Sequence, residues 1–524
     1  MSFSYYNPVQ IHFDVDILES LQNLAENELA SKRALLVTSK SFNQNNSSLG
    51  HSACGDFLGN AADTSLRRMS NTPHSLTLHN PKNSLTILEC RDSGNMKSQA
   101  DSSICHFCKC GQELRSCERS EKSQSPKSKA DSKINTATLD FQDSSDIESK
   151  RANLAQNIAK IFSNIIIYDS VNPNPQLESL QSAKAKIQGH YDVVIALGGG
   201  SVLDSAKFFA LHNEIVVNNG GLEIVGEAKA MPLFACPSTA GTGSELTQWA
   251  TIWDKGANVK YSLSHKCLYP QIAFYDISLL LSLPLDLSIH TTLDSLSHAV
   301  ESIWNKNANP ISTQYAKAAI ELILENLPPL YEMLTLDSKQ ILEATNSTAT
   351  TAEVSLSDFL KKLRFQGCEA FCAETSHKGC RTSKKQISLK NTKETTQIRI
   401  LRKNLAFACI QSALSFSNTQ TALAHAISYP ITMRFGVPHG LACSFTLPIL
   451  LDCISDKNAD SILRPYKQRI KNLFKTLHIS SNPRDYGLDS TMIEAIFSSL
   501  NARAKNGLLD VAKAKKRMLG LLWQ

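Results

Sequence analysis

Apolar and polar residues follow two different periodic patterns along the chain, and the pattern changes near residue 283. Before that point short apolar runs alternate with amphipathic stretches, beginning with NPVQIHF, ILESLQNLAENELA and RALLVTS. The same order resumes with NIIIYD, NPQLESLQSAKAKIQ and DVVIALGGGSVLDSAKFFAL. Short apolar runs fit buried strands, and a period of 3.6 residues indicates helices. Alternating strands and helices predict a parallel α/β sheet in an N-terminal domain of residues 1–282. We interpret MPLFACPSTAGTGSELTQWATIWD as a strand, a glycine-rich loop and a polar segment of this domain.

Beyond Ser282-Leu283-Pro284 almost every segment has a helical period. Clear examples are DLSIHTTLDSLSHAVESIW, ISTQYAKAAIELILENL and LRKNLAFACIQSALSF. Apolar residues that recur three and four positions apart form one buried stripe on a helix. The sequence therefore predicts an all-helical second domain, residues 283–524.

Two polar stretches interrupt these patterns. From about residue 47 to 150, Ser, Asn, Lys and Asp dominate and the apolar periodicity is lost. Such a stretch cannot bury enough apolar surface to offset the entropy cost of ordering it, so we expect a disordered insertion. Residues from about 355 to 399 form a second polar and basic patch, which we also interpret as an insertion.

Composition and charge narrow the class of protein. A chain of 524 residues is long enough for two domains or more, and its hydrophobic content of 42% is ordinary for a globular protein. The net charge of +6 is small for this length and gives no indication of nucleic-acid or membrane binding. No apolar run approaches the roughly 18 residues of a membrane span, and the N-terminus lacks a signal-peptide pattern. A cytoplasmic enzyme is therefore expected.

The chain contains 14 cysteines, a high number for a cytoplasmic protein. Nine of them lie in the two polar stretches. One group, CHFCKCGQELRSC, starts with the C-x2-C spacing of a zinc knuckle, but no second C-x2-C follows. We favour a solvated loop there and keep a metal site as the alternative. The other five sit singly among apolar neighbours and are expected to be buried thiols: Cys236, Cys267, Cys409, Cys443 and Cys453.

Two glycine-rich loops follow predicted strands. Gly198, Gly199 and Gly200 separate a strand from a helix, so the backbone can approach a pyrophosphate and the helix N-terminus can face it. We expect Ser201 to cap that helix. The alternative is a tight turn without a ligand. The second loop, STAGTGSE at residues 238–245, offers small hydroxyl and glycine residues of the kind that face phosphate or ribose. Together the two loops favour a dinucleotide site.

Four residues of the second domain form a candidate metal site. Asp294 and His298 are one helical turn apart and share a face, with Glu301 nearby to orient an imidazole. His425 lies in a helical segment and His439 in a Pro-His-Gly turn. Three imidazoles and one carboxylate suit Fe²⁺, Zn²⁺ or Mn²⁺. For each histidine alone, a hydrogen-bonded core residue is the simpler interpretation, so the case rests on their combination.

In combination these segments resemble the iron-containing (group III) alcohol dehydrogenase family. The resemblance rests on GGGSVLDSAK, STAGTGSE, LDSLSHAVES, ALAHAISYP and FGVPHGLACSFTLP, in that order, and both insertions fall outside it. It implies a dehydroquinate synthase-like fold, with an α/β domain that binds NAD(P), an all-α metal-binding domain and Fe²⁺ or Zn²⁺ in the cleft. The metal ligands that it implies are Asp294, His298, His425 and His439. The cofactor contacts that it implies are Gly199, Gly200, Ser201, Asp204, Thr239, Thr242, Ser244 and Lys260.

Three positions depart from the family pattern. Many members have a second histidine one turn after the third ligand, and this chain has Tyr429 there. A phenol with an ordinary pKa near 10 is a different acid, so the proton could come from Tyr429, water or a ribose hydroxyl. Ser39, followed by Lys40, stands where an Asp often binds the adenosine ribose, which favours NADPH. Asp14 replaces the glycine that usually follows IHF.

The segment SNTQTALAHAISYPITMRFGVPHG is most similar to the phosphonoacetaldehyde reductase branch. Arg434 is a candidate for binding an anionic substrate, although exposure at the surface is the simpler expectation. We therefore expect a homodimeric enzyme that interconverts a small aldehyde and a primary alcohol by hydride transfer. The alternatives are a glycerol-1-phosphate dehydrogenase, a dehydroquinate synthase-like enzyme or a non-catalytic binding scaffold on the same fold. Retention of all four metal ligands argues against the scaffold.

Overall fold

The computed structural model describes residues 3–43, 151–257, 259–346 and 392–523. The predicted insertion at residues 47–150, including CHFCKCGQELRSC, lies outside the described residues, and so do residues 355–391 of the second insertion. Helix α11 (Thr392–Thr419) begins inside the range predicted for that second insertion. Residues 392–399 are therefore helical rather than irregular.

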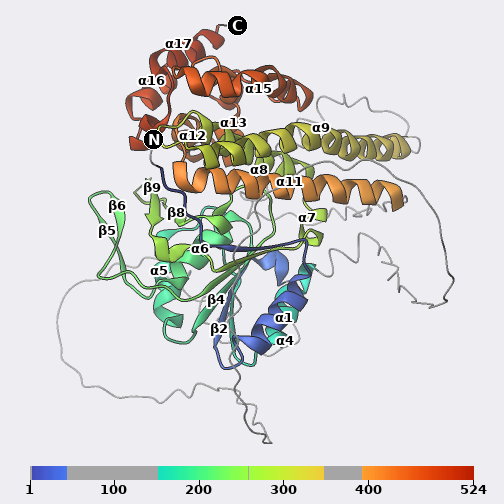
Figure 1. Cartoon of the computed structure of the whole chain (residues 1–524), viewed down its shortest axis with the longest axis vertical. Helices are drawn as coiled ribbons and strands as arrows, with labels where there is room; N and C mark the ends of the chain where they lie inside the picture. The colour runs from blue at the N-terminus through green and yellow to red at the C-terminus, as the bar shows by residue number, and fades with distance from the viewer. Residues whose placement is uncertain (1–2, 44–150, 258, 347–391, 524) are drawn as a thin grey trace, which may run out of the picture. The chain divides into compact units, whose positions relative to one another are not determined.

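Parallel strands build the central sheet of the first domain (Figure 1). The sheet has six strands in the order β1-β10-β7-β4-β2-β3, and every neighbouring pair is parallel, as predicted. Parallel neighbours require crossover connections, which place helices over the faces of the sheet. The strands are β1 (Gln10–Phe13), β2 (Ala34–Val37), β3 (Ile165–Tyr168), β4 (Val193–Gly198), β7 (Leu233–Pro237) and β10 (Ile272–Tyr275).

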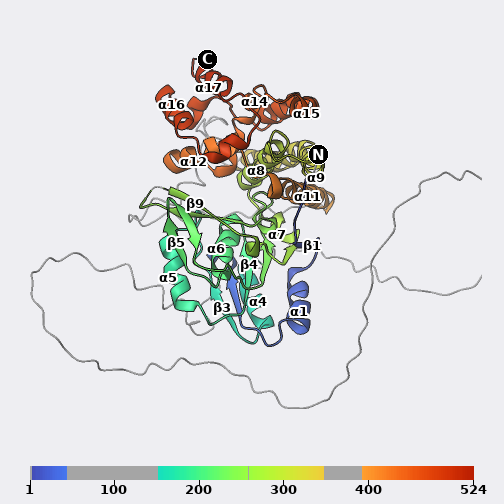
Figure 2. The same cartoon turned by 60° about the vertical axis from the view of Figure 1, so that its left-hand side comes forward.

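Helices cover both faces of this sheet, as Figure 2 shows for α1 and α4 on one side and α5 and α6 on the other. Because side chains alternate along a strand, Leu35 packs with α5 and α6 while its neighbour Leu36 packs with α1 and α4. All four residues of β2 are buried, which explains its uninterrupted apolar sequence. These helices are α1 (Ile17–Asn27), α4 (Leu154–Ile161), α5 (Leu177–Ile187) and α6 (Gly200–Ala210).

Two antiparallel hairpins extend the first domain. One joins β5 (Ile215–Asn218) to β6 (Gly221–Ile224), and the other joins β8 (Trp249–Asp254) to β9 (Val259–Ser264). The interpretation of QWATIWD as a polar segment is therefore wrong, because Ala250, Ile252 and Trp253 of β8 are buried. This hairpin contributes to the site, since β9 carries Lys260.

Helix α8 (Leu285–Ile303) is the centre of the second domain. It packs against α9 (Pro310–Asn346), α11 and α13 (His439–Ser444), and it is buried along most of its length. After Tyr275 the described elements are helical, which confirms the predicted fold class. Within the part of the chain that the structure describes, no helix is both long and apolar enough to cross a membrane. The remaining helices are α7 (Ser278–Leu281), α12 (Leu423–Phe435), α14 (Leu447–Leu450), α15 (Lys457–Thr476), α16 (Ser490–Ser498) and α17 (Val511–Leu521).

Asp14 shows how the chain accommodates the loss of the usual glycine. Its φ of 59° lies in the left-handed region, which Asp tolerates better than most side chains. Its carboxylate accepts hydrogen bonds from Arg399 (3.0 Å) and Lys403 (2.6 Å), both on α11. The turn keeps the glycine-like backbone, and the new carboxylate ties the end of β1 to the helical domain.

Candidate metal and cofactor site

One cavity of about 500 Å³ is lined by all the residues that were predicted as metal ligands, proton donor or direct cofactor contacts. Both glycine-rich loops contribute to its wall, as do α8 and α12. The residues are therefore neighbours in space, and their individual roles stay predictions. They are Ser39, Gly199, Gly200, Ser201, Asp204, Thr239, Thr242, Ser244, Lys260, Asp294, His298, His425, Tyr429 and His439.

The tri-glycine turn brings the two glycine-rich loops into contact. A Cβ atom on Gly200 would lie 2.7 Å from Cγ2 of Thr242, closer than side-chain atoms approach one another. Helix α6 is capped by Gly199, whereas Ser201 lies in its first turn and accepts a hydrogen bond from the amide of Asn174 (3.3 Å). The prediction that Ser201 caps the helix is thus wrong, because the helix begins at Gly200, two residues earlier than that cap would require.

Two buried charged residues of α6 hold the second loop in place. Asp204 accepts hydrogen bonds from the Ser244 hydroxyl (2.6 Å) and the Thr251 amide (2.9 Å). The Lys207 ammonium donates to the carbonyls of Ser244 and Trp249, both at 2.6 Å. Burial raises the pKa of Asp204 and lowers the pKa of Lys207 to about 8. Sequence reasoning gave Lys207 no role, although it lies in the GGGSVLDSAK motif.

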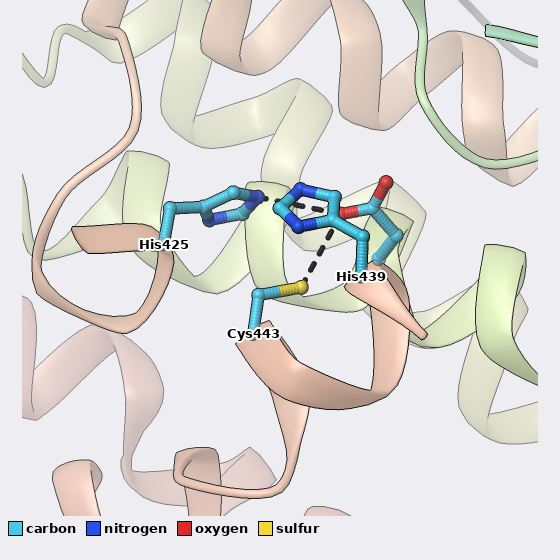
Figure 3. A group of neighbouring side chains, drawn as sticks. His425, His439 and Cys443 are labelled. Carbon is cyan, nitrogen blue, oxygen red and sulfur yellow. Dashed lines mark hydrogen bonds and ion pairs between the residues drawn. The ribbon is translucent and has the colours of Figure 1, made fainter. Parts of the chain in front are cut away.

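Side chains from three helices converge on one oxygen of Asp294. Its Oδ1 lies 3.3 Å from Nε2 of His425, 3.8 Å from Nδ1 of His298 and 3.3 Å from Sγ of Cys443. Figure 3 shows His425, His439 and Cys443 gathered around this point. Ligand atoms of Asp294, His425, His439 and Cys443 all lie within 4.8 Å of one another. The ring of His298 stands beside this group, stacked on His425 with centroids 4.4 Å apart.

Glu301 orients His425, as the sequence predicted. Its carboxylate accepts hydrogen bonds from the amides of Ala422 (2.8 Å) and Ala424 (2.6 Å) and lies 2.7 Å from Nδ1 of His425. A carboxylate at a helix N-terminus is favoured by the free amides and the helix dipole, so Glu301 also fixes the start of α12. With Nδ1 hydrogen-bonded to Glu301, Nε2 of His425 faces Asp294.

Helix α13 packs so closely on α8 that only glycine fits between them. His439 is the first residue of α13, with Pro438 as its N-cap, rather than part of an isolated turn. A Cβ atom on Gly440 would lie 1.9 Å from the carbonyl oxygen of His290. One turn later, Cys443 is a buried thiol, as predicted, and burial raises its pKa to about 11. Its contact with Asp294 was missed, although the i, i+4 spacing from His439 is visible in the sequence.

The hydrogen bonding and protonation of these side chains suit a divalent cation. Nδ1 of His298 and Nδ1 of His439 are buried and have no hydrogen-bond partner among the described residues. Burial lowers the pKa of both imidazoles to about 3, so they are neutral and offer lone pairs at neutral pH. Burial opposes ionisation of Asp294, but the surrounding imidazoles outweigh it and keep its pKa below the usual range. Burial opposes protonation of His425, but Cys443, Glu301 and Asp294 raise its pKa well above the usual value, so a bound cation would take the place of that proton. Two neutral imidazoles beside an ionised carboxylate fit Fe²⁺ or Zn²⁺.

Tyr429 lies between the candidate metal ligands and two cations. Its ring stacks on the ring of His439, with centroids 6.1 Å apart and an interplanar angle of 10°. The ammonium of Lys260 is 3.7 Å from the centroid of the phenol ring, and Arg503 donates a hydrogen bond to its hydroxyl (3.3 Å). Burial opposes ionisation, but Lys260, Arg503 and His425 lower the pKa of Tyr429 to about 8. The phenol is therefore a stronger acid than its residue type suggests.

The arginine that the sequence indicated does not line the cavity, and two that it did not indicate do. Arg434, the candidate for anion binding, is exposed and is not among the described residues that line the cavity, so exposure was the correct expectation. Arg503 does line the cavity, and nothing in the polar segment NARAKNG indicated it. Ser39 lines the cavity near Arg151, which stacks on Phe42, whereas the exposed Lys40 is absent from the described lining.

Models of one protein family match most of the described chain. Residues 143–277 match the model "Iron-containing alcohol dehydrogenase". Residues 288–360 and 386–515 match "Fe-containing alcohol dehydrogenase family, C-terminal". Together the two models cover well over half of the sequence, and they contain every predicted site residue except Ser39.

Individual relatives and solved structures are consistent with these matches. Alcohol dehydrogenase 4 of Saccharomyces cerevisiae is 35% identical over 176 residues, 32% of this chain and 45% of the relative. NAD-dependent methanol dehydrogenase of Bacillus methanolicus is 33% identical over 182 residues, 33% of this chain and 47% of the relative. The chain thus spans about half the length of the curated relatives that it matches. A sulfoacetaldehyde reductase structure from Bifidobacterium kashiwanohense, in complex with NAD+, shares the fold with a TM-score of 0.59 at 17% identity over 99% of both chains.

Proposed function

Because the chain belongs to the iron-containing alcohol dehydrogenase family, we propose that it interconverts an aldehyde and a primary alcohol by hydride transfer. One observation carries the proposal. The two glycine-rich loops and the cluster around Asp294 line the same cavity, so a dinucleotide and a metal-bound substrate could meet there. Family membership favours this activity over the glycerol-1-phosphate dehydrogenase, dehydroquinate synthase and scaffold alternatives. The homodimer and the cytoplasmic location stay predictions.

Asp294, His298, His425 and His439 are the proposed metal ligands. When bound, Fe²⁺ or Zn²⁺ would polarise the carbonyl oxygen as a Lewis acid, and the nicotinamide would carry the hydride. Helix α8 carries Asp294 and His298, and Glu301 orients His425, so the protein's own contacts position three of the four proposed ligands. The buried Cys443 thiol donates to Asp294 and is proposed to orient this carboxylate rather than to coordinate.

Tyr429 is the proposed proton donor for aldehyde reduction. The contact with His439 places its ring against the proposed metal site, and its pKa of about 8 suits an acid that works near neutral pH. Water and a ribose hydroxyl are the other possible donors. A proton donor is needed because hydride addition leaves negative charge on the former carbonyl oxygen.

NADPH is the proposed cofactor in preference to NADH. Ser39 lines the cavity where many family members have an Asp, so no carboxylate at this position would repel a 2′-phosphate. The cation that lines the cavity together with Ser39 is Arg151 rather than the predicted Lys40, and its guanidinium also donates to the Ser282 hydroxyl (2.9 Å). For the substrate, the resemblance of residues 417–440 to the phosphonoacetaldehyde reductase branch makes phosphonoacetaldehyde the first compound to test.

The proposal is tested with purified full-length protein loaded with Fe²⁺ or Zn²⁺. Oxidation of NADH and NADPH is followed across a panel of aldehydes that includes phosphonoacetaldehyde. We expect turnover that stops after chelation and resumes when the metal is restored.

Asp294→Ala should lose bound metal and activity together, measured by elemental analysis and by rate. Asp286→Ala is the matched control, because Asp286 is an exposed carboxylate on the same helix. Full activity in a metal-free Asp294→Ala protein would contradict the mechanism. A metal-loaded protein that binds no nicotinamide cofactor would favour the alternative of a non-catalytic binding scaffold.

A further inference from the structure

Two cationic side chains lie in the cavity wall without an acidic partner. Arg503, from the short helix η5 (Ala502–Asn506), donates hydrogen bonds to the hydroxyls of Ser262 (2.7 Å) and Tyr429 (3.3 Å). Lys260, from β9, lies over the rings of Tyr429 and Trp253. Among the described residues, neither cation has a carboxylate within ion-pair distance. A buried or half-buried cation loses hydration free energy unless an anion compensates its charge. These two side chains therefore indicate a site for an anionic ligand.

The acidic groups of the cavity act on Lys260 only from beyond ion-pair distance, and each has closer partners. Asp204 is engaged by the Ser244 hydroxyl and the Thr251 amide. Asp294 is surrounded by imidazoles and is a proposed metal ligand. The positive charge of Arg503 and Lys260 is therefore available to a molecule that enters the cavity.

The position of Arg503 separates it from the expected site for the cofactor pyrophosphate. That group would sit at the tri-glycine turn and the N-terminus of α6. Arg503 instead contacts Tyr429, whose ring stacks on His439, a proposed metal ligand. A single aromatic side chain thus lies between the guanidinium and the metal site. A short substrate could place its carbonyl at the metal and its other end at Arg503.

Local structure holds Arg503 in this position. The side chain of Asn501 accepts a hydrogen bond from the Arg503 amide (3.0 Å), and the buried Asn506 donates to the carbonyl of Thr421 (3.2 Å) just before α12. With its two hydroxyl contacts the guanidinium still has N–H donors to spare, in a planar fork that matches oxyanions. The residue is therefore preorganised for a ligand.

We propose that Arg503, assisted by the charge of Lys260, binds an oxyanion at the end of the substrate remote from the reacting carbon. The substrate class is a short aldehyde, or the corresponding alcohol, that carries a phosphonate, sulfonate or carboxylate group. This inference rests on the proposed function, because it assigns the second end of a substrate whose first end is at the metal. It replaces Arg434 as the anion-binding candidate.

The test compares anionic and neutral aldehydes of similar length with the metal-loaded full-length protein. For wild type, kcat/KM should be higher for phosphonoacetaldehyde or sulfoacetaldehyde than for propanal. Arg503→Met should lower the ratio of anionic to neutral kcat/KM roughly ten- to hundredfold, mainly through KM, because a charge-assisted hydrogen bond is lost. Arg503→Lys should recover part of the ratio. Arg434→Met, an exposed arginine on α12, should leave the ratio as it is in wild type.

A second readout does not depend on turnover. Methylphosphonate should bind the metal-loaded protein, by calorimetry, and Arg503→Met should weaken that binding by a similar factor. If Arg503→Met does not fold, Ser262→Ala removes one of the two hydroxyls that hold the guanidinium and should lower the same ratio to a smaller extent.

Three results would overturn the inference. Wild type could show no preference for anionic aldehydes. Arg503→Met could lower kcat/KM equally for both classes, or it could weaken NADPH binding instead, which would assign Arg503 to the cofactor. If wild type reduced no aldehyde of either charge, the proposed function would fail, and methylphosphonate binding that depends on Arg503 would still support the anion site.

Discussion

At the scale of single residues, Glu301 shows how one buried carboxylate serves both folding and the site. It accepts hydrogen bonds from amides at the start of α12 and orients the imidazole of His425. Glu301→Gln should lower metal affinity roughly 10- to 100-fold, since an amide cannot accept all of these hydrogen bonds. Competition with a coloured chelator measures the affinity. Glu332→Gln, at an exposed position on α9, is the control. Unchanged metal affinity in Glu301→Gln would show that Glu301 does not contribute to metal binding.

Gly440 is the residue that allows α13 to reach α8. Because a Cβ atom there would lie 1.9 Å from the His290 carbonyl oxygen, Gly440→Ala must push the two helices apart. We expect a loss of roughly 1–3 kcal/mol in the free energy of unfolding, the usual cost of overpacking, together with weaker metal binding. Thermal unfolding with and without metal measures both. Gly520→Ala in α17 meets no atom within 4 Å and should leave stability the same or raise it.

At the scale of elements, α6 and the loop after β7 form one unit held by buried charge. The buried ammonium of Lys207 donates to the carbonyl of Ser244 in this loop and to the carbonyl of Trp249 in β8. Lys207→Met should cost roughly 1–3 kcal/mol and loosen the loop, so the dissociation constant for NADPH should rise. Fluorescence titration measures the constant, and Lys160→Met at an exposed position on α4 is the control. A destabilised variant with unchanged NADPH affinity would limit Lys207 to a structural role.

At the scale of the whole molecule, the described ends on either side of residues 44–150 lie close together. The Arg151 guanidinium is 4.6 Å from the centroid of the Phe42 ring, and the Gln156 side chain donates to Asn43 (2.6 Å). A short linker could therefore replace residues 47–147 without moving the cavity wall. We expect kcat and KM within about twofold of the full chain, as for other tolerated changes between adjacent ends. Loss of metal or of NADPH binding in the shortened protein would show that the segment takes part in the site.

The sequence predicted features that depend on local pattern and on motif. Uninterrupted apolar strands such as ALLV, followed by amphipathic helices, allow few arrangements other than a parallel sheet covered on both faces. The motifs likewise indicated Asp294, His298, His425 and His439. Helical spacing alone put Glu301 beside the metal candidates, and its hydrogen bond to His425 confirms that reasoning.

Features without a local pattern were missed. The hairpin of β8 and β9 depends on pairing that its mixed sequence did not indicate. Arg503 belongs to a short polar segment and enters the cavity only because η5 packs against α12. The low pKa of Tyr429 depends on Lys260 and Arg503, which are 169 and 74 positions away in the chain, and such long-range charge contacts leave no trace in periodicity.

The sequence by itself therefore determined the fold class, the family and the predicted metal ligands and cofactor contacts, because these follow from periodicity and from short motifs. Only the tertiary structure decided which arginine faces the cavity, how Asp14 adopts a glycine-like backbone and how acidic Tyr429 is. Each of these depends on contacts between residues far apart in the chain. The periodicity of apolar residues predicts which segments form helices and strands, whereas the packing of these elements decides which charged side chains come into contact.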